Sequence, residues 1–323
     1  MRSGEFEWIA RYLSPLAAAE SFGLLDDAAM LSIPAGRRLA VTQDAIVENI
    51  HFLSADPPDL VARKALRVNI SDIVAKGASP LAYSLALGVP DTWRDEHMAQ
   101  FANGLETDQR IYGIELTGGD TFRSPERLTI SVTLFGHVDP ERYRSRAGAN
   151  VDDCILVSGT IGDAALGLKH LSGEFGLELN KAESLQNAYR LPEPPARIAG
   201  LVAEYATASM DISDGLIGDC RKLCDASGVS ATLERSRIPV SEATQAVLDH
   251  DNRFWTSVLT GGDDYQVLCT VSPDRVGKYV EQAEQVGIQV TQIGVTKKGQ
   301  SGNITLDIDG VEVSIDKDSY SHF

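Results

Sequence analysis

Short strand patterns and longer helix patterns alternate along this chain in two series. In the first series, apolar residues recur with a helical period in three segments and cluster or alternate as in strands in three others. The helical segments are the first dozen residues, 59–77 and 94–112, and the strand segments are 39–42, 83–89 and 128–138. Because such alternation is typical of helices that cover a sheet, we predict an α/β unit here.

A second series of the same kind follows a loop rich in arginine and glycine at 142–150. Strands are predicted at 154–158, 208–212 and from 265 onward, and helices at 163–171, 197–206 and 214–226. A chain of 323 residues is longer than one hydrophobic core usually organises. We therefore predict an α/β (α+β) fold with two domains, at residues 1–140 and 141–323.

The charge of the chain excludes several kinds of partner. Its 46 acidic and 29 basic residues give a net charge of -17, which repels nucleic acid and anionic lipid where no basic groove intervenes. No apolar run approaches the ~20 residues of a membrane-spanning helix. The first ten residues carry Glu5 and Glu7, where a signal peptide would be basic and then apolar. We expect a cytoplasmic protein that binds neither nucleic acid nor a membrane.

The cysteines and histidines point to no metal centre or hydrolytic triad. Cys154, Cys220, Cys224 and Cys269 form no CxxC pair and have no histidine at zinc-finger spacing. The six histidines are scattered, and no serine or cysteine motif of a hydrolase accompanies them. Zinc binding, a disulfide framework and triad hydrolysis are therefore disfavoured.

Aspartates stand beside small residues at five places where strands are expected to end. These places are 25–28, 42–44, 118–121, 210–215 and 261–264. Ligands of α/β folds bind beyond the carboxyl ends of strands, and magnesium takes oxygens from one or two carboxylates and from phosphate. A single aspartate of this kind is more often a turn former or a helix cap. The recurrence is what predicts a site for magnesium and a nucleoside triphosphate.

Two further patterns support this reading, and each has a simpler alternative. The pairs Gly118-Gly119 and Gly261-Gly262 allow a backbone to approach a phosphate closely, although tight turns need glycine as well. In the helix at 59–77, Asn69, Asp72 and Lys76 share one flank. Asp72 and Lys76 could form a surface ion pair there.

The motifs of the whole chain resemble those of the thiamine-monophosphate kinase family, which shares a superfamily with aminoimidazole ribonucleotide synthetase and selenophosphate synthetase. The matching segments are 26–29, 47–52, 64–72, 118–121, 146–149, 210–216, 261–265 and 320–323. The resemblance implies an N-terminal domain with a mixed sheet that binds ATP and metal and forms a homodimer. It also implies a C-terminal α/β domain that completes the nucleotide and substrate site.

The resemblance implies a role for each matching residue. The metal ligands, for several Mg²⁺ ions, would be Asp27, Thr42, Asp44, Asp72, Asp120, Asp211 and Asp214. The residues in contact with the co-substrate ATP would be Gly119, Asp120, Arg146 and Ser213. Thiamine monophosphate would contact His51, Asp263 and Tyr320. No separate catalytic residue is expected, because phosphoryl transfer depends mainly on positioning and on charge neutralisation by metal.

Five positions depart from the family pattern. Leu25 and Asp152 replace glycines, Gln43 a threonine, Lys76 a methionine and Asp263 a glutamate. Gln43 could alter one metal site, and Lys76 could compete with a metal for Asp72. Two other functions remain open: an ATP-dependent enzyme like aminoimidazole ribonucleotide synthetase, and a nucleotide-binding module with weakened catalysis.

Overall fold

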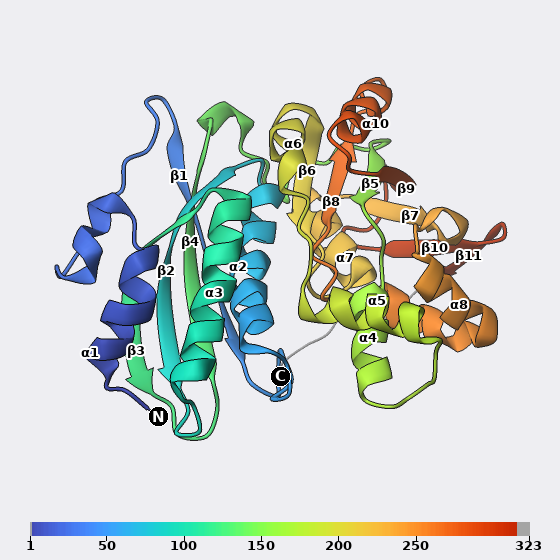
Figure 1. Cartoon of the computed structure of the whole chain (residues 1–323). Coiled ribbons are helices and arrows are strands. Elements are labelled where there is room, and N and C mark those ends of the chain that lie inside the picture. Colours follow the sequence, from blue (N-terminus) through green and yellow to red (C-terminus); the bar gives the residue numbers. More distant parts are fainter. Residues whose placement is uncertain (1, 315–323) are drawn as a thin grey trace. The chain divides into compact units, whose positions relative to one another are not determined.

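The computed structural model of the chain describes residues 2–314 (Figure 1). The chain divides into two compact units, of which the first comprises Met1–Ile73 and Ala78–Pro140. The second comprises Val74–Gly77 and Glu141–Phe323. Tyr320, a predicted substrate contact, lies outside the described residues.

The first unit is built on a four-stranded sheet with the order β1-β4-β2-β3. Its strands are β1 (Arg38–Val47), β2 (Ser79–Val89), β3 (Glu115–Arg123) and β4 (Thr129–Val138). β4 runs antiparallel to β1 and β2, while β2 and β3 are parallel. A parallel pair needs a long crossover connection, and helix α3 (Asp95–Tyr112) supplies it. The sheet is therefore mixed.

Helices α2 (Pro58–Ala75) and α3 pack side by side beside this sheet (Figure 1). Every second residue of β4 is buried, as expected for a strand with one covered face. Between the helices, Arg67 donates to Asp108 at 2.7 Å and Arg63 donates to the same carboxylate at 2.9 Å. Asp108 is fully buried, so this ion pair holds α2 against α3.

The N-terminal segment forms several short turns. Helix α1 (Glu5–Trp8) continues into a π-helical turn (Ile9–Leu13) and two 3₁₀ turns (Ser14–Leu16 and Ala19–Leu24). The backbone N–H of Ala18 donates to the Leu116 carbonyl at 2.8 Å, and the Ser21 hydroxyl donates to the same oxygen at 3.1 Å. These bonds fix the segment against β3.

The second unit contains a seven-stranded sheet with the order β11-β10-β7-β9-β5-β8-β6. Its strands are β5 (Cys154–Ser158), β6 (Ala206–Asp211), β7 (Ser230–Glu234), β8 (Val267–Val271), β9 (Val290–Lys297), β10 (Ile304–Ile308) and β11 (Val311–Ser314). Neighbours are antiparallel except for β7 and β10. Few neighbours in this sheet are consecutive in the chain, so its order depends on long-range contacts.

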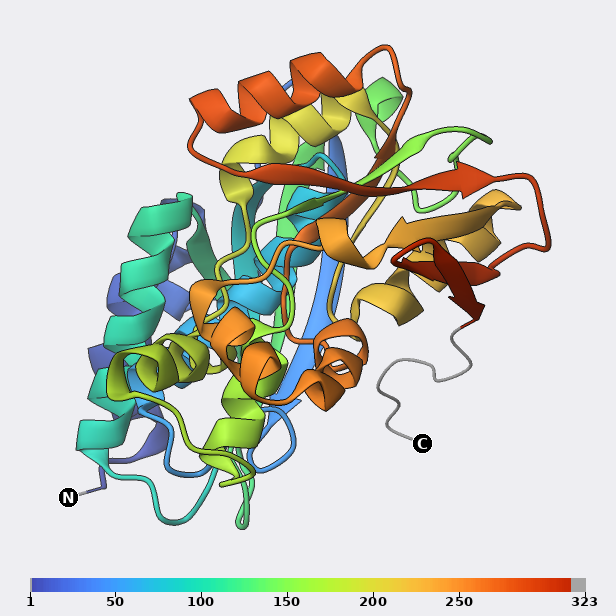
Figure 2. The ribbon, with the colours of Figure 1, turned by 90° about the vertical axis from the view of Figure 1, so that its right-hand side faces the viewer.

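Helices cover both faces of the second sheet. Figure 2 shows α6 and α10 on one side of it and α4, α5 and α8 on the other. The helices are α4 (Asp163–Leu171), α5 (Leu179–Arg190), α6 (Ala199–Tyr205), α7 (Leu216–Ser227), α8 (Glu242–His250), α9 (Trp255–Thr260) and α10 (Val276–Gln285). α7 contributes Leu216, Ile217 and Leu223 to the core and ends at Gly228, whose φ of 72° suits a helix C-terminus.

Several predicted elements differ from the observed ones. The predicted strand at 39–42 is the first half of the ten-residue β1, and the segment 118–121 lies inside β3 and not at a corner. Glycine pairs are uncommon inside strands, which is why the sequence favoured a turn there. α10 was also missed, since the region after 265 was predicted as strands alone. Among residues 2–314, no helix is long and apolar enough to cross a membrane.

Candidate active site

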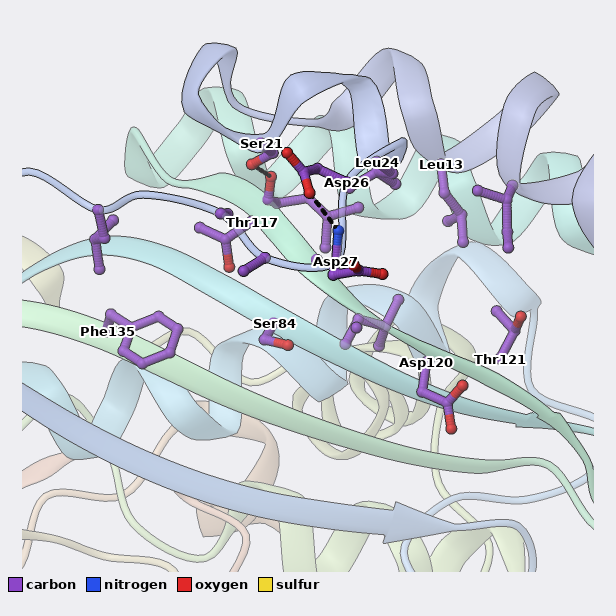
Figure 3. A pocket seen from close by; sticks show the side chains of 18 of the residues that line it. Leu13, Ser21, Leu24, Asp26, Asp27, Ser84, Thr117, Asp120, Thr121 and Phe135 are labelled. Carbon is purple, nitrogen blue, oxygen red and sulfur yellow. Dashed lines mark hydrogen bonds between the residues drawn. The ribbon is translucent and has the colours of Figure 1, made fainter.

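The first unit contains a cavity of about 510 Å³ between its N-terminal segment and its sheet. Asp26 and Asp27 line it from the N-terminal segment, and Asp120 lines it from β3 (Figure 3). Gly119 of β3 lines it as well. Ser84 of β2 adds a further polar group. The remaining wall is largely apolar and includes Leu13, Leu24, Leu116 and Phe135. The cavity thus combines an apolar surface with a few polar groups, as small-molecule sites commonly do.

An unusual backbone brings Asp26 and Asp27 to this cavity. Phe22, Gly23 and Leu24 have φ values of 51°, 66° and 62°, so the chain turns sharply before the two aspartates. The N–H of Asp27 then donates to Asp26 Oδ1 at 2.8 Å (Figure 3). Left-handed φ values are costly at the non-glycine residues Phe22 and Leu24, and they persist only where the surrounding structure holds them. The bonds from Ala18 and Ser21 to Leu116 provide that support.

Gly119 is required here by strand packing. A Cβ atom at Gly119 would lie 1.8 Å from the Leu85 carbonyl oxygen of β2, whereas one at Gly118 would meet no atom within 4 Å. The close approach of Leu85 thus gives a reason for glycine at 119 that the sequence pattern did not supply, and the predicted approach of a phosphate stays a prediction. Gly118 keeps an open side, and both residues line the cavity.

A second cluster of predicted ligands forms where β1 meets α2. Thr42 Oγ1 donates to Asp72 Oδ2 at 2.6 Å, and the N–H of Asp44 donates to Asn69 Oδ1 at 3.0 Å. Thr42 and Asp44 are two residues apart and therefore lie on the same face of β1. The structure thus brings Thr42, Asp44 and Asp72 together. It adds Asn69, which the sequence placed on the same helix flank as Asp72.

His51 belongs to a turn that several hydrogen bonds hold in place. Its Nδ1 accepts from the N–H of Val47 at 3.1 Å, and its carbonyl accepts from Lys64 Nζ at 2.9 Å. Lys64 is almost completely buried, with 1% of its surface exposed. His51 is not among the residues that line the 510 Å³ cavity.

In the second unit, Asp211 is the last residue of β6, and the loop between β6 and α7, here called the Ser213 loop, carries Ser213 and Asp214. Asp219, in the first turn of α7, accepts the backbone N–H of Ser213 at 3.0 Å and that of Asp214 at 2.9 Å on the same oxygen. The helix predicted at 214–226 begins later than predicted, at Leu216 after Gly215, and has no side-chain cap. The loop is held by Asp219 instead.

Lys222 joins the same network. Its Nζ donates to Asp219 Oδ1 at 2.8 Å and to Asp214 Oδ2 at 2.5 Å. Burial raises the pKa of the Asp219 carboxyl. Burial by itself would lower the pKa of Lys222, but its hydrogen bonds to Asp214 and Asp219 outweigh that effect, so the pKa of Lys222 is raised. The ammonium group therefore stays charged between the two carboxyl groups.

The loop at 261–265 packs directly on the Ser213 loop. The N–H of Asp263 donates to the Ser213 carbonyl at 2.9 Å, and that of Tyr265 donates to the Ile212 carbonyl at 2.7 Å. A Cβ atom at Gly262 would lie 2.3 Å from the Ser213 carbonyl oxygen, which explains the glycine. The structure thus brings Asp263 beside Ser213.

Asp264 anchors the other side of this loop. Its Oδ1 accepts from the N–H of Gly162, the residue before α4, at 2.8 Å. Within residues 2–314, its Oδ2 is buried and has no hydrogen-bond partner. Burial raises the pKa of Asp264 well above its ordinary value. A protonated Asp264 avoids the cost of a buried charge.

Arg146 lies apart from Ser213 within the second unit. Its carbonyl accepts from the hydroxyl of Ser227, the last residue of α7, while Ser213 and Asp214 precede the first residue of that helix. A helix of 12 residues is about 18 Å long. The backbone of Arg146 is thus anchored at the opposite end of α7 from the Ser213 loop.

The five residues that depart from the family pattern differ in exposure, hydrogen bonding and backbone conformation. Leu25 has an ordinary φ of -103° and a side chain that is 93% exposed, so it does not obstruct the cavity. Gln43 lies on the other face of β1 from Thr42 and donates to Ser131 Oγ, so it cannot replace an oxygen in that cluster. Lys76 donates to the Ser209 carbonyl at 2.6 Å. Asp152 and Asp263 have φ values of 70° and 62°, a region that aspartate tolerates better than most residues.

The predicted metal ligands all offer oxygen atoms, which suit a hard cation that binds together with phosphate. Within residues 2–314, no three His, Cys, Asp or Glu side chains converge closely enough to hold a metal ion. The predicted ligands therefore form no closed carboxylate cage. Magnesium usually takes one or two carboxylates and completes its shell with water and phosphate oxygens. Asp27 and Asp120, which share the cavity, fit that pattern.

Asp219 and Lys222 were not among the site residues predicted from the sequence. Both follow the motif at 210–216 on the same helix, three residues apart, which is the spacing of side chains that can interact. The sequence does contain a signal for this pair: an acidic and a basic residue stand three positions apart, directly after the motif with two aspartates.

Comparison with known families defines the class of protein first. Residues 25–138 match the N-terminal domain of AIR synthase related proteins, and residues 150–307 match their C-terminal domain. The chain is therefore an AIR synthase related protein that contains both domains. The structure of hydrogenase maturation protein HypE, at 17% identity and a TM-score of 0.77, shares this fold.

Closer relatives define the family. The thiamine-monophosphate kinase of Caulobacter vibrioides is 37% identical over 303 residues, which cover 92% of this chain and 85% of that protein. The enzyme of Salmonella typhimurium is 34% identical over 100% of this chain and 99% of its own. The chain belongs to the thiamine-monophosphate kinase family.

Two solved structures agree with this placement. The thiamine-monophosphate kinase from Stenotrophomonas maltophilia K279a superposes with a TM-score of 0.84 at 32% identity, covering 96% of this chain and 98% of its own. A structure described as AaThiL complexed with AMPPCP and TMP superposes with a TM-score of 0.79 at 29% identity, covering 100% and 99%.

Proposed function

We propose that this protein phosphorylates thiamine monophosphate with ATP and forms thiamine diphosphate and ADP. The observation that carries the proposal is the full-length match to a relative described with AMPPCP and TMP. AMPPCP is an ATP analogue. We read TMP as thiamine monophosphate, the phosphate acceptor that gives the family its name. The cavity with Asp27, Gly119 and Asp120 supplies a place for a phosphate-bearing ligand in the same fold.

Direct transfer of a phosphoryl group from one phosphate to another requires little covalent chemistry from the protein. The acceptor phosphate is ionised near neutral pH, so no strong general base is required. When bound, magnesium neutralises the charge that spreads over the transferred phosphoryl group. The protein's own contribution is to orient the two substrates and to exclude water.

In our proposal, residues of both units bind magnesium and ATP. In the first unit, Asp27 and Asp120 hold magnesium in the cavity and Gly119 borders the nucleotide, while Thr42, Asp44 and Asp72 form a second group of oxygens. In the second unit, Asp211 and Asp214 add carboxylates, and Ser213 and Arg146 contact ATP. His51, Asp263 and Tyr320 contact thiamine monophosphate. Their assignment follows the family motifs. The shared cavity supports the group of Asp27, Gly119 and Asp120. Hydrogen bonds support the group of Thr42, Asp44 and Asp72.

We also propose that the protein is a cytoplasmic homodimer joined through the first-unit sheet. β1 is an edge strand of that sheet, and its side chains Leu39 and Val41 are 43% and 56% exposed. Exposed apolar side chains on an edge strand favour association. Analytical ultracentrifugation checks the stoichiometry, and a Val41→Lys variant should shift the protein toward the monomer.

The test of the proposed reaction is a product assay. Purified protein receives ATP, magnesium and thiamine monophosphate, and thiamine diphosphate and ADP are quantified together by chromatography. Equal amounts of the two products are expected, and both should disappear when magnesium is chelated. ADP without thiamine diphosphate, or ATP binding without either product, would overturn the proposal and favour another acceptor or a nucleotide-binding module.

A further inference from the structure

Lys222 reaches beyond its own helix to a predicted metal ligand. Its partner Asp219 lies three residues earlier on α7, whereas its other partner, Asp214, belongs to the loop before the helix. A pair at this spacing within one helix is an ordinary feature. The bond of 2.5 Å to Asp214 is different, because it covers a carboxylate oxygen that a cation would need.

The three side chains differ in their access to solvent. Asp219 is fully buried, while Lys222 and Asp214 have 37% and 39% of their side chains exposed. Asp219 is fixed further by the N–H groups of Ser213 and Asp214, which bond to one of its two oxygens. Its other oxygen binds Lys222. Asp219 is therefore the rigid member of the network, and Lys222 and Asp214 are the members that a solute can reach.

This arrangement allows Asp214 to lose Lys222 without a change in the loop. If the bond between Lys222 and Asp214 breaks, Lys222 keeps its bond to Asp219, and the backbone of Ser213 and Asp214 keeps both bonds to the same carboxylate. The carboxylate of Asp214 then becomes available to a cation, already placed by its backbone.

We propose that Lys222 is a built-in competitor for the cation site of Asp214, and that Asp219 is the positioning residue that retains both Lys222 and the Ser213 loop. The divalent cation must displace the ammonium group from Asp214 and leaves it on Asp219. The inference rests on the proposed function only in taking Asp214 as a cation ligand. Lys222 thereby weakens cation binding at Asp214 before nucleotide arrives.

The experiment measures Mn²⁺ binding to the full-length protein without any nucleotide, by electron paramagnetic resonance. Lys222→Met should tighten Mn²⁺ binding about twofold to fivefold, the range expected for loss of a partly exposed ion pair. Lys169→Met is the matched control, since it removes an equal charge from a similarly exposed lysine whose partner is Glu174. That control should leave Mn²⁺ affinity unchanged.

A second pair of variants locates the effect at Asp214. Asp214→Asn should lose one Mn²⁺ site, and adding Lys222→Met to it should bring no further tightening. Equal Mn²⁺ affinity of the Lys222→Met and Lys169→Met proteins would overturn the proposal. A gain from Lys222→Met that persists in the Asp214→Asn background would overturn it as well. Because no substrate is present, these outcomes are independent of whether the kinase reaction occurs.

Asp219→Asn tests the positioning role. The amide retains one oxygen for the two backbone N–H groups and no longer carries the charge that retains Lys222. We expect a protein that still folds but melts at a lower temperature, because a fully buried carboxylate has lost its ion pair. Its Mn²⁺ binding should be weaker, because Lys222 then pairs with Asp214 alone. Introducing Lys222→Met into this variant should restore the affinity. Failure of that rescue in a folded protein would contradict the role of Asp219.

Discussion

Substitution of Gly119 by alanine should destabilise the first unit strongly. The new Cβ atom would lie 1.8 Å from the Leu85 carbonyl oxygen and 2.6 Å from the carbonyl carbon. A carbon and an oxygen atom rarely approach closer than about 3.3 Å, so one strand would have to move by about 1.5 Å. β2 and β3 are paired at this point, with Leu85 opposite Gly119. The movement therefore breaks ladder hydrogen bonds as well.

The magnitude can be worked from three contributions. Overpacking costs about 1–3 kcal/mol, and the φ of 152° costs a further ~1–3 kcal/mol for a residue with a side chain. Each lost ladder hydrogen bond adds about 1 kcal/mol. With one ladder bond lost, we expect the free energy of unfolding to fall by roughly 3–7 kcal/mol, which is a large part of the stability of a domain.

Gly118→Ala is the matched control for this substitution. Its φ of 156° is nearly the same, but its Cβ atom would meet nothing within 4 Å. This variant should show only the backbone cost of about 1–3 kcal/mol. Urea unfolding followed by tryptophan fluorescence reports on the first unit through the buried Trp8 and Trp93.

The comparison of the two alanine variants is decisive. If Gly119→Ala is as stable as Gly118→Ala within ~0.5 kcal/mol, the clash with Leu85 is not what selects glycine. The role of Gly119 would then have to come from ligand contact alone.

Three further predictions concern charged groups. Asp108→Asn leaves the buried Arg67 and the partly exposed Arg63 without their carboxylate and should cost about 3–5 kcal/mol in urea unfolding. Glu106→Gln, which removes an exposed ion pair, should cost ~1 kcal/mol or less. Asp120→Asn should lower kcat/KM about 100-fold or more with an unchanged circular dichroism spectrum, and an equal activity of this variant would exclude Asp120 as a metal ligand. Arg253 hydrogen-bonds to Asp251 and lowers the pKa of that carboxyl to about 2, so any stabilisation by this pair is present above the ordinary pKa of aspartate and disappears as the pH falls through 2. NMR titration of the Arg253→Ala protein should show the pKa of Asp251 rising toward its ordinary value; an unchanged pKa would contradict this cause.

Local patterns predicted much of the fold because they depend on neighbours in the chain. The helix predicted at 59–77 is α2, observed at Pro58–Ala75, and the alternating strand at 128–138 is β4, observed at Thr129–Val138. Burial on one face requires such periods, and they are readable without a structure. The motif order identified the family for the same reason, since each motif is a short run of residues.

Other features could not be predicted from neighbours. The order of the seven strands in the second sheet cannot be read from the periodicity of neighbouring residues. Boundaries were also shifted, because the Gly118-Gly119 pair reads as a turn although β2 holds it inside a strand. Likewise, the sequence of the Ser213 loop resembles a helix N-terminus. In the structure, its backbone groups instead form hydrogen bonds with Asp219 and with the loop at 261–265.

The sequence by itself determined that this is a two-part α/β protein of the thiamine-monophosphate kinase family with carboxylates suited to magnesium. Only the tertiary structure decided which of those carboxylates meet, and which neighbours already bind them: Thr42 on Asp72, and Lys222 on Asp214. The physical reason is that a residue's type sets which atoms it can bind, while its partner is set by chain segments that folding brings together. Gly119 shows the same division, since its glycine is visible in the sequence but the Leu85 carbonyl that requires it is 34 residues away in the chain.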